Sequence, residues 1–302
     1  GAVMEVHAFP YFSKRASLGG DRVDRAVALY LKHLDRSCSD EVRELEGLAE
    51  GLDVPLQKIA EHNFYGDVLA VAATMEGCSC MGKQTNQGVL LSKNNDAVPT
   101  YPDAHILYHV KPDKGYENIY VAFTGMIHNP SVNGVNSAGF GMAGASIGPV
   151  YMEFRIDAIE RSIFAKRVLQ YAANVEEALS MFADAMKGPG LGGGANCVLG
   201  DKTGRLVAVE FTDKDLYVEE AKDGVAFRTN HPLSPVISKK LMEKEEFLKG
   251  LDNSRRRYET LGRLLRVSPA NVEGIKNVLR YHGEPANICQ HVDQTGAVMN
   301  TG

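Results

Sequence analysis

The chain has 302 residues, enough for one large domain or two ordinary ones with a sizeable core. Its formal net charge of −5 gives it no polycationic character, so nucleic acid and anionic lipid are not expected partners. No apolar run approaches the roughly 18 residues of a membrane-spanning helix, so no membrane association is expected.

Five cysteines are present, and they are scattered along the chain: Cys38, Cys78, Cys80, Cys197 and Cys289. An odd, dispersed set argues against a disulfide framework and suits a reducing compartment. We therefore expect a cytoplasmic protein.

The first part of the chain is predicted to be helical. Residues 21–36 place apolar side chains on one face at helical spacing. A second helix is expected to start with Ser39 or Asp40 as its N-cap and to stop at Gly51. A short third helix is expected from Pro55.

From Cys78 onward, blocks of strands alternate with blocks of helices. Strand patterns cover 88–92, 105–110, 118–124, 139–148, 196–200, 205–212 and 215–220. Helices are predicted over 152–172, 175–187, 235–249, 254–266 and 269–281, the last with Ser268 as cap and Pro269 at its first position. Block alternation predicts a layered α+β fold rather than a regular βαβ arrangement.

The glycine-rich stretch "GPGLGGGAN" (188–196) lacks the Gly-Lys-Ser/Thr end of a phosphate-binding loop. It is better explained as a flexible connector that delivers Asn196 to the start of a strand. "CSC" at Cys78–Cys80 is a weak metal motif, because structural zinc needs four ligands at wider spacing and no second cysteine pair exists. We expect no metal and no organic cofactor.

Nucleophilic catalysis is the remaining interpretation of Cys78. A thiol that attacks an amide needs a base, and the α-amino group of a chain beginning with Cys78 could serve, since its unperturbed pKa is about 7.7–8.0. This requires cleavage between Gly77 and Cys78, where the small glycine would let the thiol reach the preceding carbonyl.

"CSCMGKQTNQGVLLSKNND" is predicted to form a β-hairpin that turns near Asn86–Gly88. If the turn centres on Gln87, Asp96 lies opposite Cys78; a turn shifted by one residue would put Asn95 there. The alternative is that Asn94, Asn95 and Asp96 simply end a strand with polar turn residues.

These residues resemble the nucleophile hairpin of the N-terminal-nucleophile (Ntn) cysteine hydrolases. The most similar branch is the isopenicillin-N acyltransferase (acyl-CoA:6-aminopenicillanic acid acyltransferase) family, with choloylglycine hydrolases and penicillin V acylases as more distant relatives. Six further segments resemble family blocks in order: 44–63, 132–144, 192–212, 228–232, 253–265 and 281–291.

The resemblance implies a four-layer αββα sandwich with antiparallel sheets. It implies a helical pro-segment, residues 1–77, that stays bound after self-cleavage to the catalytic unit, residues 78–302. It matches Cys78 to the nucleophile, Asp96 to the carboxylate that holds the new amine, Asn196 to an oxyanion-hole amide and Arg257 to the arginine near the nucleophile. Without the resemblance, Asn196 would be taken as a strand cap and Arg257 as part of a solvated helix face.

Several positions depart from the family pattern. Lys93 stands where bile-salt hydrolases have arginine, Ser146 where they have an oxyanion-hole asparagine, Cys80 where serine or threonine is usual, and Gln290 where arginine is expected. Lys93, Asn94, Ser146 and Cys80 are therefore candidates for supporting the substrate or the oxyanion.

The expected activity is cleavage or transfer of the acyl group of a small amide or thioester through a Cys78 acyl-enzyme. The expected partners are a small acyl amide or acyl-CoA substrate and the chain's own pro-segment, and a homo-oligomer is left open. One alternative is a choloylglycine or penicillin-V type amidohydrolase that acts on N-acyl amino compounds or peptides without acyl-CoA. An alternative of another class is an unprocessed, non-catalytic binding protein.

Overall fold

The computed structural model describes most of the predicted catalytic unit and most of the helical region before it. The described residues are 20–68, 77–96, 105–123, 125–128, 133–147, 157–188, 190–242, 251–292 and 298–299. Two of the predicted helices run partly outside these ranges, at residues 152–156 and 243–249.

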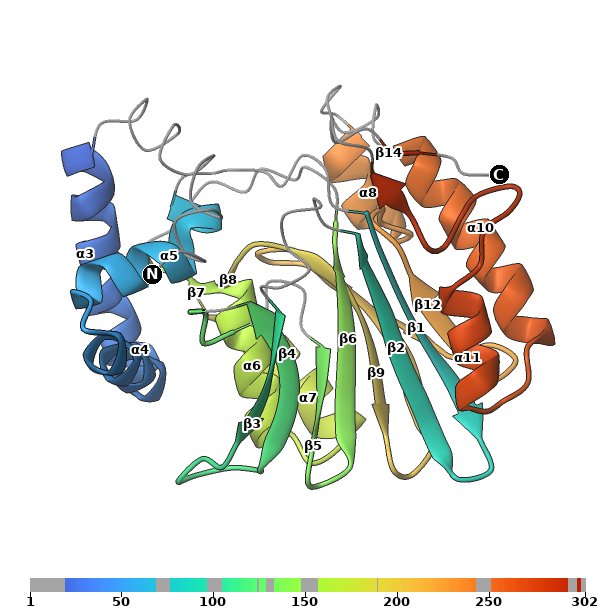
Figure 1. Ribbon diagram of the computed structural model, residues 1–302, viewed down its shortest axis with the longest axis horizontal. Coiled ribbons are helices and arrows are strands. Elements are labelled where there is room, and N and C mark those ends of the chain that lie inside the picture. The colour runs from blue at the N-terminus through green and yellow to red at the C-terminus, as the bar shows by residue number, and fades with distance from the viewer. Residues whose placement is uncertain are drawn as a thin grey trace.

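Within the described ranges, three helices precede the sheets: α3 (Gly20–Ser37), α4 (Ser39–Leu52) and α5 (Leu56–Val68). They share a core that includes Tyr30, Leu34, Leu45, Ile59 and Phe64, and this core continues into Ile127 and Ile163 of the neighbouring layers. Figure 1 shows them as a separate group beside the sheets. The region predicted to be helical is therefore helical, as far as it is described.

The ends of α4 differ from the prediction. Cys38 is the N-cap, because its carbonyl accepts the backbone N–H groups of Glu41 and Val42. Gly51 continues the helix, and Asp53 ends it in the left-handed conformation with φ 53°. Neither Ser39 nor Asp40 caps the helix, and Gly51 does not stop it.

The strands form two main antiparallel sheets. The smaller one has the order β12–β1–β2, and the larger one has the order β11–β10–β9–β6–β5–β4–β3. The bounds of the small sheet are β1 (Gly77–Thr85), β2 (Gly88–Asp96) and β12 (Val225–Arg228). Those of the large sheet are β3 (His105–Val110), β4 (Asn118–Phe123), β5 (Asn133–Asn136), β6 (Phe140–Ser146), β9 (Ala195–Asp201), β10 (Leu206–Phe211) and β11 (Leu216–Glu220).

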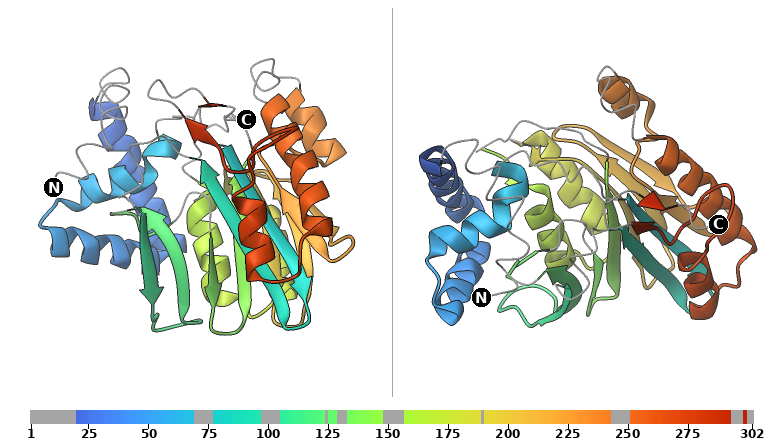
Figure 2. Two further views of the ribbon diagram at one scale, coloured as in Figure 1. Left: turned by 45° about the vertical axis from the view of Figure 1, so that its right-hand side comes forward. Right: turned by 45° about the horizontal axis from the view of Figure 1, so that its top comes forward.

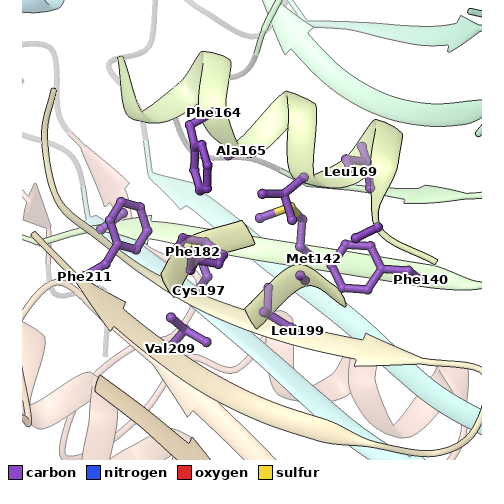
Figure 3. Packing of buried hydrophobic residues seen from close by; sticks show 14 of the residues in the cluster. Phe140, Met142, Phe164, Ala165, Leu169, Phe182, Cys197, Leu199, Val209 and Phe211 are labelled. Carbon is purple, nitrogen blue, oxygen red and sulfur yellow. The ribbon is translucent and has the colours of Figure 1, made fainter. Parts of the chain in front are cut away.

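Helices cover the outer face of each sheet. The large sheet packs against α6 (Arg161–Tyr171) and α7 (Val175–Lys187). Figure 3 shows this core, where the Phe182 ring contacts both Phe164 from α6 and Phe211 from β10. The small sheet packs against α10 (Leu251–Val267) and α11 (Val272–Leu279).

Small side chains fill the space between the two sheets. This inner core contains Cys78, Cys80, Ala143, Ala145, Val198, Leu206, Ala208 and Ala226. Small residues let the two sheets approach closely. The order helices–sheet–sheet–helices, visible in Figures 1 and 2, confirms the predicted four-layer αββα arrangement.

Two helix starts lie later than predicted. The Glu160 carboxylate accepts the backbone N–H groups of Ser162 and Ile163, so α6 begins at Arg161 rather than at residue 152. Asn271 caps α11 by accepting the N–H of Gly274. Ser268 instead lies at the end of α10, where its hydroxyl donates to the Leu265 carbonyl.

The remaining elements are short: β7 (Ile159–Glu160) pairs in parallel with β8 (Leu191–Gly192), β13 (His291–Val292) pairs with β14 (Val298–Met299), and α8 covers Pro235–Met242. Within the described ranges, no helix combines the length and the apolar character required for crossing a bilayer.

Charged contacts join the N-terminal helices to the sheet layers. Arg167 on α6 bonds both carboxylate oxygens of Glu41 on α4, at 3.1 and 2.9 Å. Lys166 bonds Glu44 at 2.5 Å. The Tyr30 hydroxyl accepts the backbone N–H of Glu160 at 2.8 Å. The Glu41 side chain is only 1% exposed, so the Glu41–Arg167 ion pair is buried between the N-terminal helices and α6.

Candidate active site

The β1–β2 hairpin closes through a two-residue turn, Asn86–Gln87, between the paired residues Thr85 and Gly88. Gly88 adopts φ 124°, a conformation that favours glycine. In this register Cys78 lies opposite Asn95 and Gly77 lies opposite Asp96. The prediction that Asp96 faces Cys78 is therefore wrong by one residue, because the turn is not centred on Gln87; the stated alternative, Asn95, is found.

The register sorts the hairpin side chains onto two faces. Side chains alternate along a strand, and directly opposed residues share a face. Cys78 and Cys80, with Asn95 and Lys93 opposite them, belong to the face turned toward the large sheet. Asp96 belongs to the other face, toward α10 and α11.

Polar contacts fix the backbone on both sides of Cys78, whose side chain is fully buried. Its backbone N–H donates to Asn230 Oδ1 at 2.7 Å, and its carbonyl accepts from Arg257 Nη1 at 2.5 Å. Its Sγ lies 3.4 Å from Asn95 Oδ1. The residue is therefore held through its backbone as well as through its thiol.

Arg257 on α10 is 2% exposed and joins several of these groups. Its Nη2 donates to Asn230 Oδ1 at 2.8 Å, and its Nε donates to Asn253 Oδ1 at 2.7 Å. Burial lowers the pKa of Arg257, whereas the negative charges of Asp96 and of a Cys78 thiolate raise it. The structure thus brings Arg257 to Cys78, and it is not on a solvated helix face.

Asp96 lies against Gly77. A Cβ built on Gly77 would be 2.7 Å from Asp96 Oδ2 and 3.2 Å from Gln290 Oε1. Burial raises the pKa of Asp96 to about 7, against the opposing charges of Arg257 and Lys93 and a hydrogen bond from the Gln290 backbone. Among the described residues, the buried Oδ2 has no hydrogen-bond partner. An acceptor is therefore available next to the Gly77–Cys78 peptide.

Asn230 was not identified from the sequence. It follows β12, and besides its contacts to Cys78 and Arg257 its Nδ2 donates to the Ser146 carbonyl at 2.8 Å. The block "RTNHP" drew attention to the region but not to this residue. Asn230 lies 152 positions from Cys78, and the pairing of β1 with β12 brings the two into the same region.

Asn196, at the second position of β9, is completely buried. Its Nδ2 donates to the carbonyls of Thr229 at 2.7 Å and His231 at 3.0 Å. An asparagine amide has two N–H groups. Both are used on the segment that carries Asn230, and neither is left for an oxyanion.

The four support candidates have different surroundings. Asn94 donates to the carbonyls of Leu279 and Ile288, on the helix-facing side of the hairpin. Cys80 Sγ lies 3.7 Å from the Arg228 carbonyl, and burial raises the pKa of Cys80 to about 12. Ser146 contributes its carbonyl to Asn230, and Lys93 lies opposite Cys80.

All five cysteines lie in the described part of the chain, and none of them forms a disulfide there. Across the described ranges, no group of three or more His, Cys, Asp or Glu side chains is arranged to hold a metal ion.

Comparisons with solved structures return amide-cleaving enzymes at low identity. The C2A mutant of conjugated bile acid hydrolase from Clostridium perfringens is 20% identical with TM-score 0.38, covering 54% of this chain and 57% of that one, a little over half its length. Penicillin V acylase from Agrobacterium tumefaciens is 14% identical with TM-score 0.38, covering 67% and 68%. The N-acylethanolamine-hydrolyzing acid amidase ortholog of Caenorhabditis elegans is 13% identical with TM-score 0.47, covering 70% and 89%. No protein-family model matches the sequence, and comparison with curated proteins finds no match.

Proposed function

We propose that this chain is a self-cleaving cysteine amidohydrolase of the Ntn type, with Cys78 as its nucleophile. One observation carries the proposal: the Gly77–Cys78 peptide is enclosed by the groups that its cleavage needs. Asp96 lies against Gly77, and Asn230 accepts the Cys78 N–H of this peptide. Arg257 binds the Cys78 carbonyl, which belongs to the next peptide, and so fixes the backbone of the nucleophile.

Self-cleavage would proceed as an acyl shift from nitrogen to sulfur. Cys78 Sγ attacks the Gly77 carbonyl carbon, the bond from that carbon to the Cys78 nitrogen breaks, and the nitrogen takes up the thiol proton. The product is a Gly77 thioester on Sγ and a free amine on Cys78. Water then hydrolyses the thioester, which restores the thiol and leaves Gly77 with a carboxylate.

The mature site would use the new amine as its base. The amine takes the Cys78 thiol proton while Sγ attacks a substrate amide carbonyl, and it returns a proton to the departing amine of the substrate. Asp96 is within reach of the new ammonium group, whose charge would lower the carboxyl pKa below its value in the uncut chain. Water resolves the acyl-enzyme.

The oxyanion needs N–H donors that are free in the resting site. Asn230 Nδ2 donates one N–H to Ser146, and we assign its second N–H to the oxyanion. Asn230 therefore takes the role that the resemblance gave to Asn196.

The pro-segment, residues 1–77, is proposed to remain bound after the cut, as a partner of residues 78–302. The buried Glu41–Arg167 pair, the Glu44–Lys166 pair and the Tyr30–Glu160 bond all connect the two sides of the cleavage point. None of them depends on the peptide that would be broken.

Intact mass spectrometry of purified wild-type protein and of Cys78→Ala tests the assignment. We expect two polypeptides from the wild type, the larger beginning Cys-Ser-Cys, and one uncut chain from the variant. A cut that persists in Cys78→Ala, or an uncut wild-type chain, would overturn it.

The acyl acceptor and donor need a separate assay. Mature enzyme is given a panel of N-acyl amino compounds, peptides and acyl-CoAs, with and without added amines, and acyl release and acyl transfer are measured by mass spectrometry. Hydrolysis of amides without turnover of acyl-CoA supports the amidohydrolase, whereas acyl transfer from acyl-CoA to an amine identifies an acyltransferase.

A further inference from the structure

We infer that Asn196 and Glu210 are positioning residues, which hold the segment Arg228–Ser234 so that Asn230 meets Cys78. This inference rests on the proposed function, and it assigns to Asn196 an indirect role. The two residues are direct partners across β9 and β10, and both are completely buried.

Asn196 holds the segment at the two residues that flank Asn230. Its amide N–H groups bind the carbonyls of Thr229 and His231. Two hydrogen bonds from one planar amide to residues on either side of Asn230 restrict both of its backbone neighbours. The Asn230 side chain is thereby left to face Cys78 and Arg257.

Glu210 holds both ends of the same segment. Its carboxylate accepts from Arg228 Nε at 3.1 Å, from the Leu233 backbone N–H at 2.8 and 2.9 Å, and from the Ser234 backbone N–H at 2.8 Å. A buried carboxylate that is paired and hydrogen-bonded fixes geometry firmly, because losing its ion-pair partner would leave a buried charge uncompensated and losing a backbone bond would leave a buried N–H without an acceptor.

A third contact completes the arrangement from α10. Ser254 Oγ accepts the backbone N–H of Asn230 at 2.8 Å and lies 2.8 Å from His231 Nδ1. The segment is therefore anchored before, at and after Asn230. An amide whose position is set from several sides can hold its bonds to Cys78 within the narrow tolerance that catalysis requires.

The test compares Asn196→Ala and Glu210→Gln with a matched control, Asn136→Ala. Asn136 is also buried, and its amide also binds two backbone carbonyls, those of Leu169 and Ala172, but on the helix-facing side of the large sheet. Self-cleavage rates are followed on denaturing gels after cell-free synthesis. Backbone hydrogen exchange of peptides spanning 228–234 is measured in each variant combined with Cys78→Ala, so that all chains are in the same uncut form.

We expect Asn196→Ala and Glu210→Gln each to slow self-cleavage by about 10- to 100-fold, the scale of a small misplacement at a reacting centre. We expect both variants to increase the rate of backbone hydrogen exchange in peptides spanning 228–234. Asn136→Ala should do neither. Because Glu210→Gln leaves Asn196 in place, it decides the question even if Asn196→Ala does not fold.

One result would show that Asn196 acts directly on the reaction and would overturn the inference. In that result Asn196→Ala slows self-cleavage without changing backbone hydrogen exchange over 228–234, and Glu210→Gln cleaves at the normal rate. The inference is also overturned if Asn196→Ala cleaves at the wild-type rate, or, where Asn196→Ala does not fold, if Glu210→Gln cleaves at the wild-type rate. Failure of the proposed function is separate and has its own signature: an uncut wild type, or a cut in Cys78→Ala.

Discussion

Gly77 and Asp96 are direct partners across the β1–β2 hairpin, and the carboxylate occupies the space that a side chain on residue 77 would need. Real Cβ atoms do not approach an oxygen as closely as the 2.7 Å found here. Glycine is therefore required before Cys78 for a steric reason. The Asp96 carboxylate imposes this requirement, and it is the same group that we propose to bind the new amine of Cys78.

Gly77→Ala should slow self-cleavage by about 10- to 100-fold, because either Asp96 or the Gly77–Cys78 peptide must move away from its position. The measurement is the fraction of cut chain by intact mass over time. Gly47→Ala is the control, since a Cβ at Gly47 on α4 meets nothing within 4 Å. Normal cleavage by Gly77→Ala would show that Asp96 does not confine this peptide.

The two sulfurs of "CSC" should behave differently. Cys80→Ala should still cleave itself, with a loss of about 1 kcal/mol in the free energy of unfolding for the vacated space and the weak bond to the Arg228 carbonyl. Cys78→Ala should not cleave. Intact mass and urea unfolding measure the two effects, and an uncut Cys80→Ala chain that is otherwise folded would contradict the assignment.

The buried Asp96 should make stability depend on pH. Its pKa is about 7 in the folded, uncut chain, compared with an ordinary aspartate value of about 4. The folded chain then binds this proton more tightly than the unfolded chain, so the carboxyl costs no stability below about pH 4 and destabilises progressively as the pH rises toward 7.

Asp96→Asn in the Cys78→Ala background should therefore raise the urea midpoint at about pH 8, and the gain should vanish near pH 4. Asp184→Asn, at a position whose side chain is 67% exposed, is the control and should show no such trend. If Asp96→Asn raised the urea midpoint more at acid pH than at alkaline pH, the expected direction of the pH dependence would be wrong.

The attachment of the N-terminal helices should depend on Glu41. Glu41→Ala removes the partner of Arg167 and should cost about 2–3 kcal/mol, between the values for exposed and buried pairs. In the two-chain form, size-exclusion chromatography in increasing urea should show earlier loss of residues 1–77.

Arg43→Ala is the matched control on the same helix. Arg43 pairs with Asp40, but its side chain is 64% exposed, so its removal should change stability by about 0–1 kcal/mol. Equal effects from Glu41→Ala and Arg43→Ala would show that the buried pair does not hold the pro-segment.

Local patterns in the sequence predicted the layers better than they predicted the site. The strand and helix blocks predicted a layered α+β fold, and the resemblance added the αββα order. The hairpin was found with its register one residue off. A single residue in the turn decides that register, and Asn86–Gln87 is not one of the strong turn pairs. The N-caps Glu160 and Asn271 were missed because helix-forming patterns also occur before them in the sequence.

The contact between Cys78 and Asn230 could not be predicted from local patterns. It depends on the pairing of β1 with β12, which are about half a chain apart, and on the anchoring of Arg228–Ser234 by residues of β9 and β10. Arg257 is similar: its place on α10 suggests an exposed helix face, and only the packing of α10 on the small sheet buries it.

The central position of β1 in the small sheet has a consequence for the mature protein. Chain ends are ordinarily the most loosely held parts of a domain. Cleavage before Cys78 would instead create an end at the start of a strand bonded to β2 along its whole length and to β12 from Cys80 onward. The proposed nucleophile would thus combine the chemistry of a free terminus with the fixed position of an interior residue.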